Sequence, residues 1–234
     1  MHEDFPVQHN GIFKDRFVAP NVGYFGVFDR EQSDLADALV GAVCDEPNFK
    51  YMVPNEQARV RFLTAFFGIA GRAGQLRGEV LTGQDGNSAA VWIRCYGAFA
   101  LASVVRMAIR TTPRQWSRPD LKRCLTVAEQ LDQVHRRLVC GPHWYLLATG
   151  IEKSMIEPIR LRFDADHLPC YIETFNEKYL SLWKRHGFRI VGGGTISRNG
   201  PDFWAMMRGV SEISTFPEGS PRFDDISIMG IRRE

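Results

Sequence analysis

The stretch LPCYIETFNEKYLSLWKRHGF, residues 168–188, decides how this chain is expected to fold. Its apolar run at 169–175 is typical of a strand that is buried on both faces. Residues 176–186 then follow a helical pattern, with Asn176 as a favourable N-cap and Gly187 as a favourable residue just beyond the helix. A buried strand that leads directly into a capped helix indicates an α/β domain.

Further strands and helices are predicted on both sides of this stretch. A second continuous apolar run at 143–151 predicts another strand buried on both faces, and a short helix is expected at 157–166. Strands are also expected at 188–191 and 203–207, with a bend or bulge permitted by the glycines 192–194.

The N-terminal half reads as strand, two helices and two strands. The strands are expected at 22–28, 79–82 and 89–95, with a hairpin turn at 84–87, and the helices at 35–43 and 55–72. Pro47 within Asp45–Asn48 is expected to end the first of these helices and so to separate the two.

Residues 97–138 are predicted to form a helical insert. Two amphipathic helices, at 97–110 and 121–138, flank a proline-containing loop, and two helices are too few to bury both of their faces alone. We therefore expect a tail at 1–21, a domain at 22–210 that includes this insert, and a C-terminal extension at 211–234.

Composition narrows the function classes. The net charge of +2 on 234 residues gives no electrostatic argument for nucleic acid or a membrane surface, and no apolar run is long enough to span a bilayer. The five cysteines are odd in number and form no CxxC pair, so neither a disulfide framework nor a zinc site is expected. A cytoplasmic, reducing setting and no metal are predicted.

Four motifs resemble the GNAT (GCN5-related N-acetyltransferase) superfamily in their order and spacing. They are His143–Leu147, Leu168–Asn176, Arg185–Phe188 and Phe203–Met207. The resemblance covers roughly residues 22–208. It implies an α/β (α+β) fold with a mixed central sheet that splays between its two middle parallel strands, and with helices on both faces.

The resemblance also implies where acetyl-CoA would lie. The pantetheine chain would occupy the gap between the two middle strands and pair with the backbone of Ala148, Thr149, Gly150 and Ile151. Asn176 would cap the next helix close to the cofactor, although capping alone would also explain an asparagine there.

Three residues could line the acceptor pocket: Trp92, Arg94 and Trp144. The tryptophans are alternatively core residues. Arg94 could bind a carboxylate or phosphate, or could simply be exposed at a strand edge. The helical insert is expected to cover the mouth of the cleft and to shape the choice of acceptor.

The sequence departs from the family pattern at two places. The family places a glycine-rich, basic loop after Ile151 to bind the pyrophosphate, whereas this chain has no glycine between Gly150 and Gly187. The family also places a tyrosine, which protonates the leaving thiolate, at the position of Trp183, and indole cannot act as that acid. Trp183 would lie beside the cofactor, and Tyr179, one helical turn earlier, could supply the proton.

Two further residues are candidates for acid–base chemistry. His143 at the start of its strand could act as a base or could be a structural histidine bonded to backbone. Glu173 lies within an apolar strand, where it could orient or activate an amine or could form a buried pair with Arg160 or Arg162.

Two hypotheses of function follow. The first is an acyltransferase that moves an acetyl or related group from CoA to an amine of a small molecule, with weak CoA binding because the glycine loop is shortened. The second is a GNAT-fold protein that has lost acetyl transfer and acts as a ligand-binding module or an enzyme of different chemistry. A sequence that lacks a segment after Ile151 would explain the loop but not Trp183.

Overall fold

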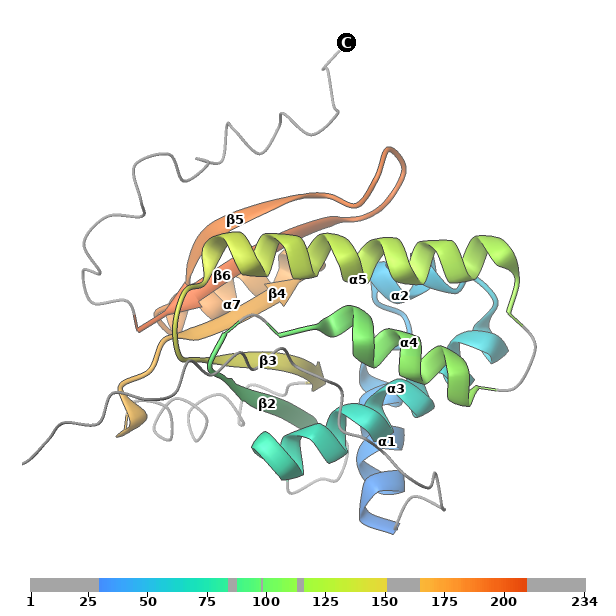
Figure 1. The fold of residues 1–234 in the computed structure, drawn as a ribbon, viewed down its shortest axis with the longest axis horizontal. Helices are drawn as coiled ribbons and strands as arrows, with labels where there is room; N and C mark the ends of the chain where they lie inside the picture. Colours follow the sequence, from blue (N-terminus) through green and yellow to red (C-terminus); the bar gives the residue numbers. More distant parts are fainter. Residues whose placement is uncertain (1–29, 84–87, 98, 113–115, 151–164, 210–234) are drawn as a thin grey trace, which may run out of the picture.

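The computed structural model describes residues 30–83, 88–97, 99–112, 116–150 and 165–209, and their arrangement is shown in Figure 1. The helical elements are α1 (Arg30–Val43), α2 (Pro47–Met52), α3 (Glu56–Arg77), α4 (Leu101–Thr111), α5 (Arg118–Leu138), the 3-10 turn η1 (Glu177–Tyr179) and α7 (Leu180–Arg185). The strands are β1 (Gly78–Thr82), β2 (Ala89–Cys95), β3 (His143–Gly150), β4 (Cys170–Thr174), β5 (Arg189–Thr195) and β6 (Asp202–Arg208).

These strands form one mixed sheet in the order β1-β2-β3-β4-β6-β5. β3 and β4 lie in the middle and run parallel, and the other neighbours are antiparallel. The parallel pair is joined at Trp144↔Cys170 and Tyr145↔Tyr171, and the ladder stops there although both strands continue. The predicted sheet that splays between its two middle strands is therefore confirmed.

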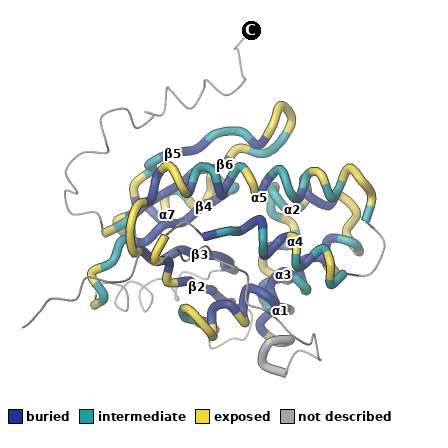
Figure 2. The backbone as a smooth tube through the Cα atoms, in the orientation of Figure 1, coloured by how far each residue is buried: buried dark blue, intermediate teal, exposed yellow. Residues whose placement is uncertain are grey.

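Helices cover both faces of this sheet, as predicted. α1, α3, α4 and α5 share one large apolar cluster with the sheet residues Val91, Ile93, Tyr145 and Leu147. α7 covers the other face, where Trp183 packs in a second cluster with the opposite side chains of β2, β3, β4 and β6. β2 and β3 are buried along almost their whole length because they are covered on both faces (Figure 2).

Several predicted elements have different ends in the structure. The break at 45–48 ends α1 and also begins α2, with Pro47 in the first turn, where a missing N–H costs little. α3 continues to Arg77, and α4 begins only at Leu101. β5 extends to Thr195 with a register shift between Ile190 and Gly192, in line with the predicted bulge.

Some predictions fall on residues outside the described part of the chain. They are the strand at 22–28, the hairpin turn at 84–87, most of the helix at 157–166, Ile151, the tail at 1–21 and the extension at 211–234. None of the helices in the described residues combines the length and apolar character needed to cross a bilayer.

Gly78 lies at the junction of α3 and β1, directly against β2. A methyl group at this position would come within 1.8 Å of the carbonyl oxygen of Trp92. Because the obstacle is backbone of a central strand, it cannot move aside. We expect Gly78→Ala to lower the free energy of unfolding by about 2 to 3 kcal/mol, measured by urea unfolding.

Gly41→Ala is the matched control. Nothing lies within 4 Å of its added methyl group, so alanine at this helical position should raise the free energy of unfolding by up to about 1 kcal/mol. Equal effects at the two sites would contradict this reading.

Candidate functional site

A cavity of about 270 Å³ lies where β3 and β4 diverge. Residues 145–150 of β3 and the end of β4 from Glu173 form its sheet side. The opposite side comes from α2, α3 and the two helices α4 and α5, while Leu182 and Trp183 reach it from α7. The predicted insert thus places both of its helices against the cleft.

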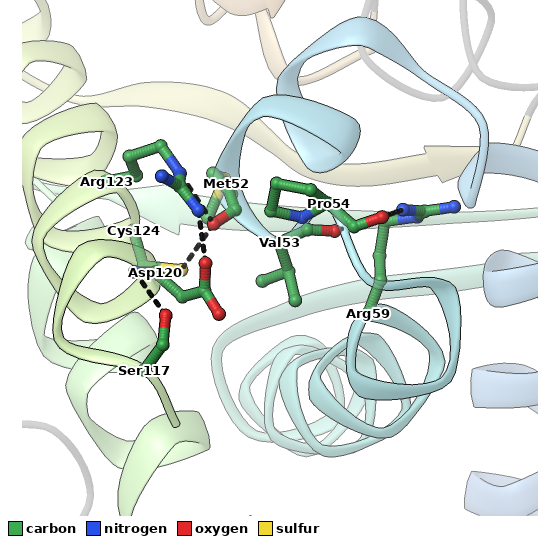
Figure 3. A network of polar contacts seen from close by, with 8 residues as sticks. All are labelled: Met52, Val53, Pro54, Arg59, Ser117, Asp120, Arg123 and Cys124. Atoms are coloured by element: carbon green, nitrogen blue, oxygen red, sulfur yellow. Dashed lines mark hydrogen bonds and ion pairs between the residues drawn. The ribbon is translucent and has the colours of Figure 1, made fainter. Parts of the chain in front are cut away.

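The segment between α2 and α3 is held in place by a polar network, which Figure 3 shows. Arg59 is 4% exposed and donates to the carbonyl oxygens of Val53 and Pro54, both at 3.0 Å. Arg123 on α5 donates to the carbonyl oxygen of Met52 at 3.4 Å. Because Met52 lines the cavity, these bonds fix one part of its wall.

Glu173 presents its carboxylate to the cavity between two tyrosine hydroxyls. Tyr145 donates to one oxygen at 3.0 Å and Tyr171 to the other at 2.9 Å. Tyr145 and Tyr171 are partners in the β3–β4 ladder, and Glu173 follows Tyr171 on the same face of β4. The carboxylate is therefore fixed at the point where the two strands separate.

Burial raises the pKa of Glu173 to about 7, and the two tyrosine hydrogen bonds oppose this rise because they favour the carboxylate. Burial, the Glu173 charge and the hydrogen bonds to it hold the pKa values of Tyr145 and Tyr171 well above 10. Both tyrosines therefore remain donors at neutral pH, while Glu173 can gain or lose a proton there.

His143 is fully buried and lies behind this site instead of lining it. Its Nδ1 lies 2.9 Å from the carbonyl oxygen of Gly141, which only accepts, so Nδ1 carries the proton. Its Nε2 lies 2.8 Å from Nε2 of His135, which then donates. Burial lowers the pKa of both histidines, and a neutral pair results.

His135 connects this pair to the tyrosines. Its ring stacks on Tyr171 with a centroid distance of 4.5 Å and lies 4.8 Å from Tyr145. One turn earlier on α5, Asp132 accepts the backbone N–H groups of Leu101 and Ala102 at 2.7 and 3.1 Å. This capping explains why α4 begins at Leu101 and ties both cleft helices together.

Tyr179 lies at the other end of the cavity, beside Glu46 and Asn176. The amide of Asn176 donates to both carboxylate oxygens of Glu46 at 3.2 Å, and its oxygen accepts from the backbone N–H of Lys178. Asn176 thus caps the next turn, as its position predicts. Burial and the Glu46 carboxylate raise the pKa of Tyr179, so its hydroxyl keeps its proton at neutral pH.

Trp183 is 4% exposed and packs edge-on against Phe188 with a centroid distance of 5.1 Å. Trp183 is also one of the two α7 residues that border the cavity. At the end of β3, Gly150 lies so close to α1 that a methyl group would come within 2.3 Å of Ala42. Packing on α1 therefore explains this glycine without any ligand.

The three predicted acceptor residues are not brought to this cavity. Trp92 and Trp144 belong to the cluster on the other face of the sheet, and Trp144 donates to Asp166 at 3.1 Å. Arg94 is exposed and lies over the ring of Tyr96, 5.7 Å from its centroid. Arg94 and Trp144 border a separate depression, which Arg77, Glu79 and Asp166 also line.

The sheet side of the cavity suits an extended chain with amide groups. Past Tyr145, the edge of β3 that faces β4 has no ladder partner among the described residues. Thr149 also borders the cavity, and its buried hydroxyl has no hydrogen-bond partner in the part of the chain that is described. Both features offer hydrogen bonds to a bound molecule. Within the described residues, no group of three or more His, Cys, Asp or Glu side chains could hold a metal ion.

Comparison with known proteins supports the fold. No protein-family model and no curated protein sequence matches the chain. Its structure is similar to a crystal structure of a histone acetyltransferase HPA2 and related acetyltransferase from Corynebacterium glutamicum. The TM-score is 0.50 with 18% identity, over 82% of this chain and 95% of that chain. At this identity the likeness supports the fold alone: a mixed sheet with two parallel middle strands and helices on both faces.

Several groups at the site were missed by the sequence analysis: Tyr145, Tyr171, His135, Asp132 and Glu46. The spacing of Tyr171 and Glu173, two residues apart on one strand, was a usable signal because such side chains share a face. No local pattern places Tyr145, His135 or Glu46 beside them, since each comes from a distant segment.

Proposed function

We propose that this chain is a GNAT-type acyltransferase that moves an acetyl or related acyl group from CoA to an amine of a small molecule. One observation carries the proposal: a carboxylate, Glu173, is held by two tyrosine hydroxyls in the wall of a cavity between diverging parallel strands. The acetyltransferase-like fold supports it.

In this proposal Glu173 is the catalytic base. It receives the proton that the amine must lose, directly or through a water molecule. A pKa of about 7 suits this role because the carboxylate is present at neutral pH and still binds a proton well. The tyrosines Tyr145 and Tyr171 position it, since each fixes one of its oxygens.

The acyl carrier would be held along β3. Ala148, Thr149 and Gly150 border the cavity and offer backbone groups and the Thr149 hydroxyl to its amide-containing arm. When bound, acyl-CoA would supply the acyl group as a thioester. Tyr179 is placed to give a proton to the leaving sulfur because its hydroxyl stays protonated and borders the same cavity.

The direct test is turnover. The full chain is mixed with acetyl-CoA and a panel of amines, and thiol release and acetylated product are both measured. Amine-dependent release of thiol with matching product supports the proposal. Absence of product with every amine, while the protein remains folded, overturns it.

The pH dependence of kcat/KM should report Glu173. Because the carboxylate must be ionised, we expect kcat/KM to rise with pH and to level off above about pH 7. Tyr171→Phe should move this step to higher pH, since the Tyr171 hydrogen bond lowers the pKa of Glu173. Rates are measured with one amine across the pH range. A profile without a step near 7, or an unmoved step in Tyr171→Phe, would contradict Glu173 as the base.

A second candidate is a GNAT-fold protein that binds a ligand without acetyl transfer. Trp183 favours it, because a buried indole at the cavity border takes up space on the α7 side and cannot act as an acid. The residues 151–156, where a pyrophosphate-binding loop is expected, lie outside the described part of the chain. A dissociation constant for acetyl-CoA in the low micromolar range would speak against this candidate.

A further inference from the structure

The helical side of the cavity is an aromatic and aliphatic wall. Phe49 on α2 and Phe62, Phe66 and Phe67 on α3 all border it. Phe67 contacts Phe66 and Phe49 edge-on, with centroid distances of 5.3 and 6.0 Å. Residues of α4 and α5 extend the same wall with aliphatic side chains: Leu101, Val105, Val127 and Leu131.

The charges at the cavity have one sign. Glu46 and Glu173 border it, and none of its described lining residues is lysine, arginine or histidine. A carboxylate or phosphate on a ligand would therefore meet like charge with no cation among those residues to pair with, which is costly away from water. A single ammonium group would instead find Glu173 at the edge of the apolar wall.

The size of the cavity limits the apolar body. An apolar cavity of about 150 Å³ in another protein holds benzene. The cavity here has about 270 Å³, and the acyl carrier along β3 would take part of it, so the space left suits no more than one ring or branched chain that carries the amine. A long polyamine would bury further ammonium groups against phenylalanine and aliphatic side chains, which offer no hydrogen bonds.

We propose that this cavity selects a primary amine with one compact apolar body, aromatic or branched aliphatic, and rejects amines that carry a carboxylate or several positive charges. This inference rests on the proposed function, in which the amine is the acyl acceptor. The apolar body packs against the phenylalanines of α2 and α3, and the ammonium group points to Glu173.

The test compares four probes by isothermal titration with the full chain, without acetyl-CoA. The first is 2-phenylethylamine; 2-phenylethanol lacks its charge, phenylalanine adds a carboxylate, and spermidine has several charges and no ring. We expect 2-phenylethylamine to bind at least tenfold more tightly than each of the other three. Equal or weaker binding of 2-phenylethylamine would overturn the inference.

Two variants assign the binding to this cavity. Glu173→Gln should remove the preference for 2-phenylethylamine over 2-phenylethanol, because it removes the charge and keeps the shape. Val105→Phe should weaken the binding of 2-phenylethylamine at least tenfold, because the larger side chain takes up space beside the apolar wall. Glu129→Gln is the matched control, since Glu129 is an exposed acid on α5 that pairs with Arg106 outside the cavity. An effect in Glu129→Gln as large as in Glu173→Gln would overturn the assignment.

The same probes separate this inference from the proposed function. Tight binding of 2-phenylethylamine without any acetylated product would support the proposed class of ligand and would overturn the proposed acyl transfer. Acetylation of spermidine or phenylalanine in preference to 2-phenylethylamine would retain acyl transfer and overturn the ligand class.

Discussion

Glu173→Gln is expected to lower kcat/KM for acyl transfer by roughly 100- to 10,000-fold, the usual contribution of a general base. Glutamine has nearly the same shape but cannot take a proton. The network around it should survive, because the amide oxygen can accept from one tyrosine and the rotatable hydroxyl of the other can accept from the amide nitrogen. Steady-state rates above pH 7 measure the effect. A decrease of less than tenfold would mean that another group takes the proton.

The same substitution should stabilise the protein at high pH. The pKa of Glu173 is about 7 in the folded chain against an ordinary value of 4.5, so the folded state binds the proton more tightly than the unfolded state. Stability is therefore lost as pH rises from about 4.5 through 7, by up to about 3 kcal/mol. Glutamine does not titrate. Urea unfolding measures the free energy of unfolding of both proteins. The value for Glu173→Gln, relative to that of the parent chain, should increase from pH 4 to pH 8. A difference that does not change with pH would contradict the raised pKa.

Opposite effects on activity and stability would distinguish a catalytic role from a structural one. If the carboxylate served stability, its replacement should destabilise the fold. A carboxylate that is held partly buried for chemistry costs stability, and its replacement recovers that stability while activity is lost.

The central sheet could be predicted because its strands carry strong local signals. The continuous apolar runs of β3 and β4 predicted strands covered on both faces, and the structure covers them with α5 and its neighbours on one face and α7 on the other. The ends of elements were less predictable. α4 begins at Leu101 because Asp132, thirty-one residues along the chain, accepts its first backbone N–H group.

The site was predictable only in part. Glu173 stood out because a charged residue within an apolar strand needs a physical explanation. Its partners did not stand out: the expected arginines 160 and 162 lie outside the described residues, and the structure supplies two tyrosines instead. Trp92, Arg94 and Trp144 were placed at the acceptor pocket, but the strand alternation directs Trp92 and Trp144 to the face that α7 covers.

Tyr179→Phe is expected to lower turnover by roughly ten- to ten-thousandfold, because it removes the proposed proton donor to the leaving sulfur. The hydroxyl lies at the cavity and keeps its proton at neutral pH, since burial and the Glu46 carboxylate raise its pKa. The effect should fall on kcat more than on KM, as the proton is needed only when the thioester bond breaks. Tyr96→Phe is the control, because Tyr96 is 72% exposed and does not border this cavity.

The position of Trp183 provides the decisive comparison for Tyr179. Residue 183 lies four positions after Tyr179, and both residues border the cavity, so a tyrosine at 183 would stand on the α7 side of the same cavity. The double variant Tyr179→Phe, Trp183→Tyr should therefore turn over at least tenfold faster than Tyr179→Phe alone. The smaller ring also opens room where the indole packs on Phe188. Recovery would show that the proton donor has moved by one turn in this chain, with the chemistry retained. An inactive double variant beside an active parent chain would show that a phenol at position 183 cannot replace Tyr179, and an unchanged turnover in Tyr179→Phe alone would show that Tyr179 is not the donor. An inactive parent chain would leave the ligand-binding candidate as the function of this fold.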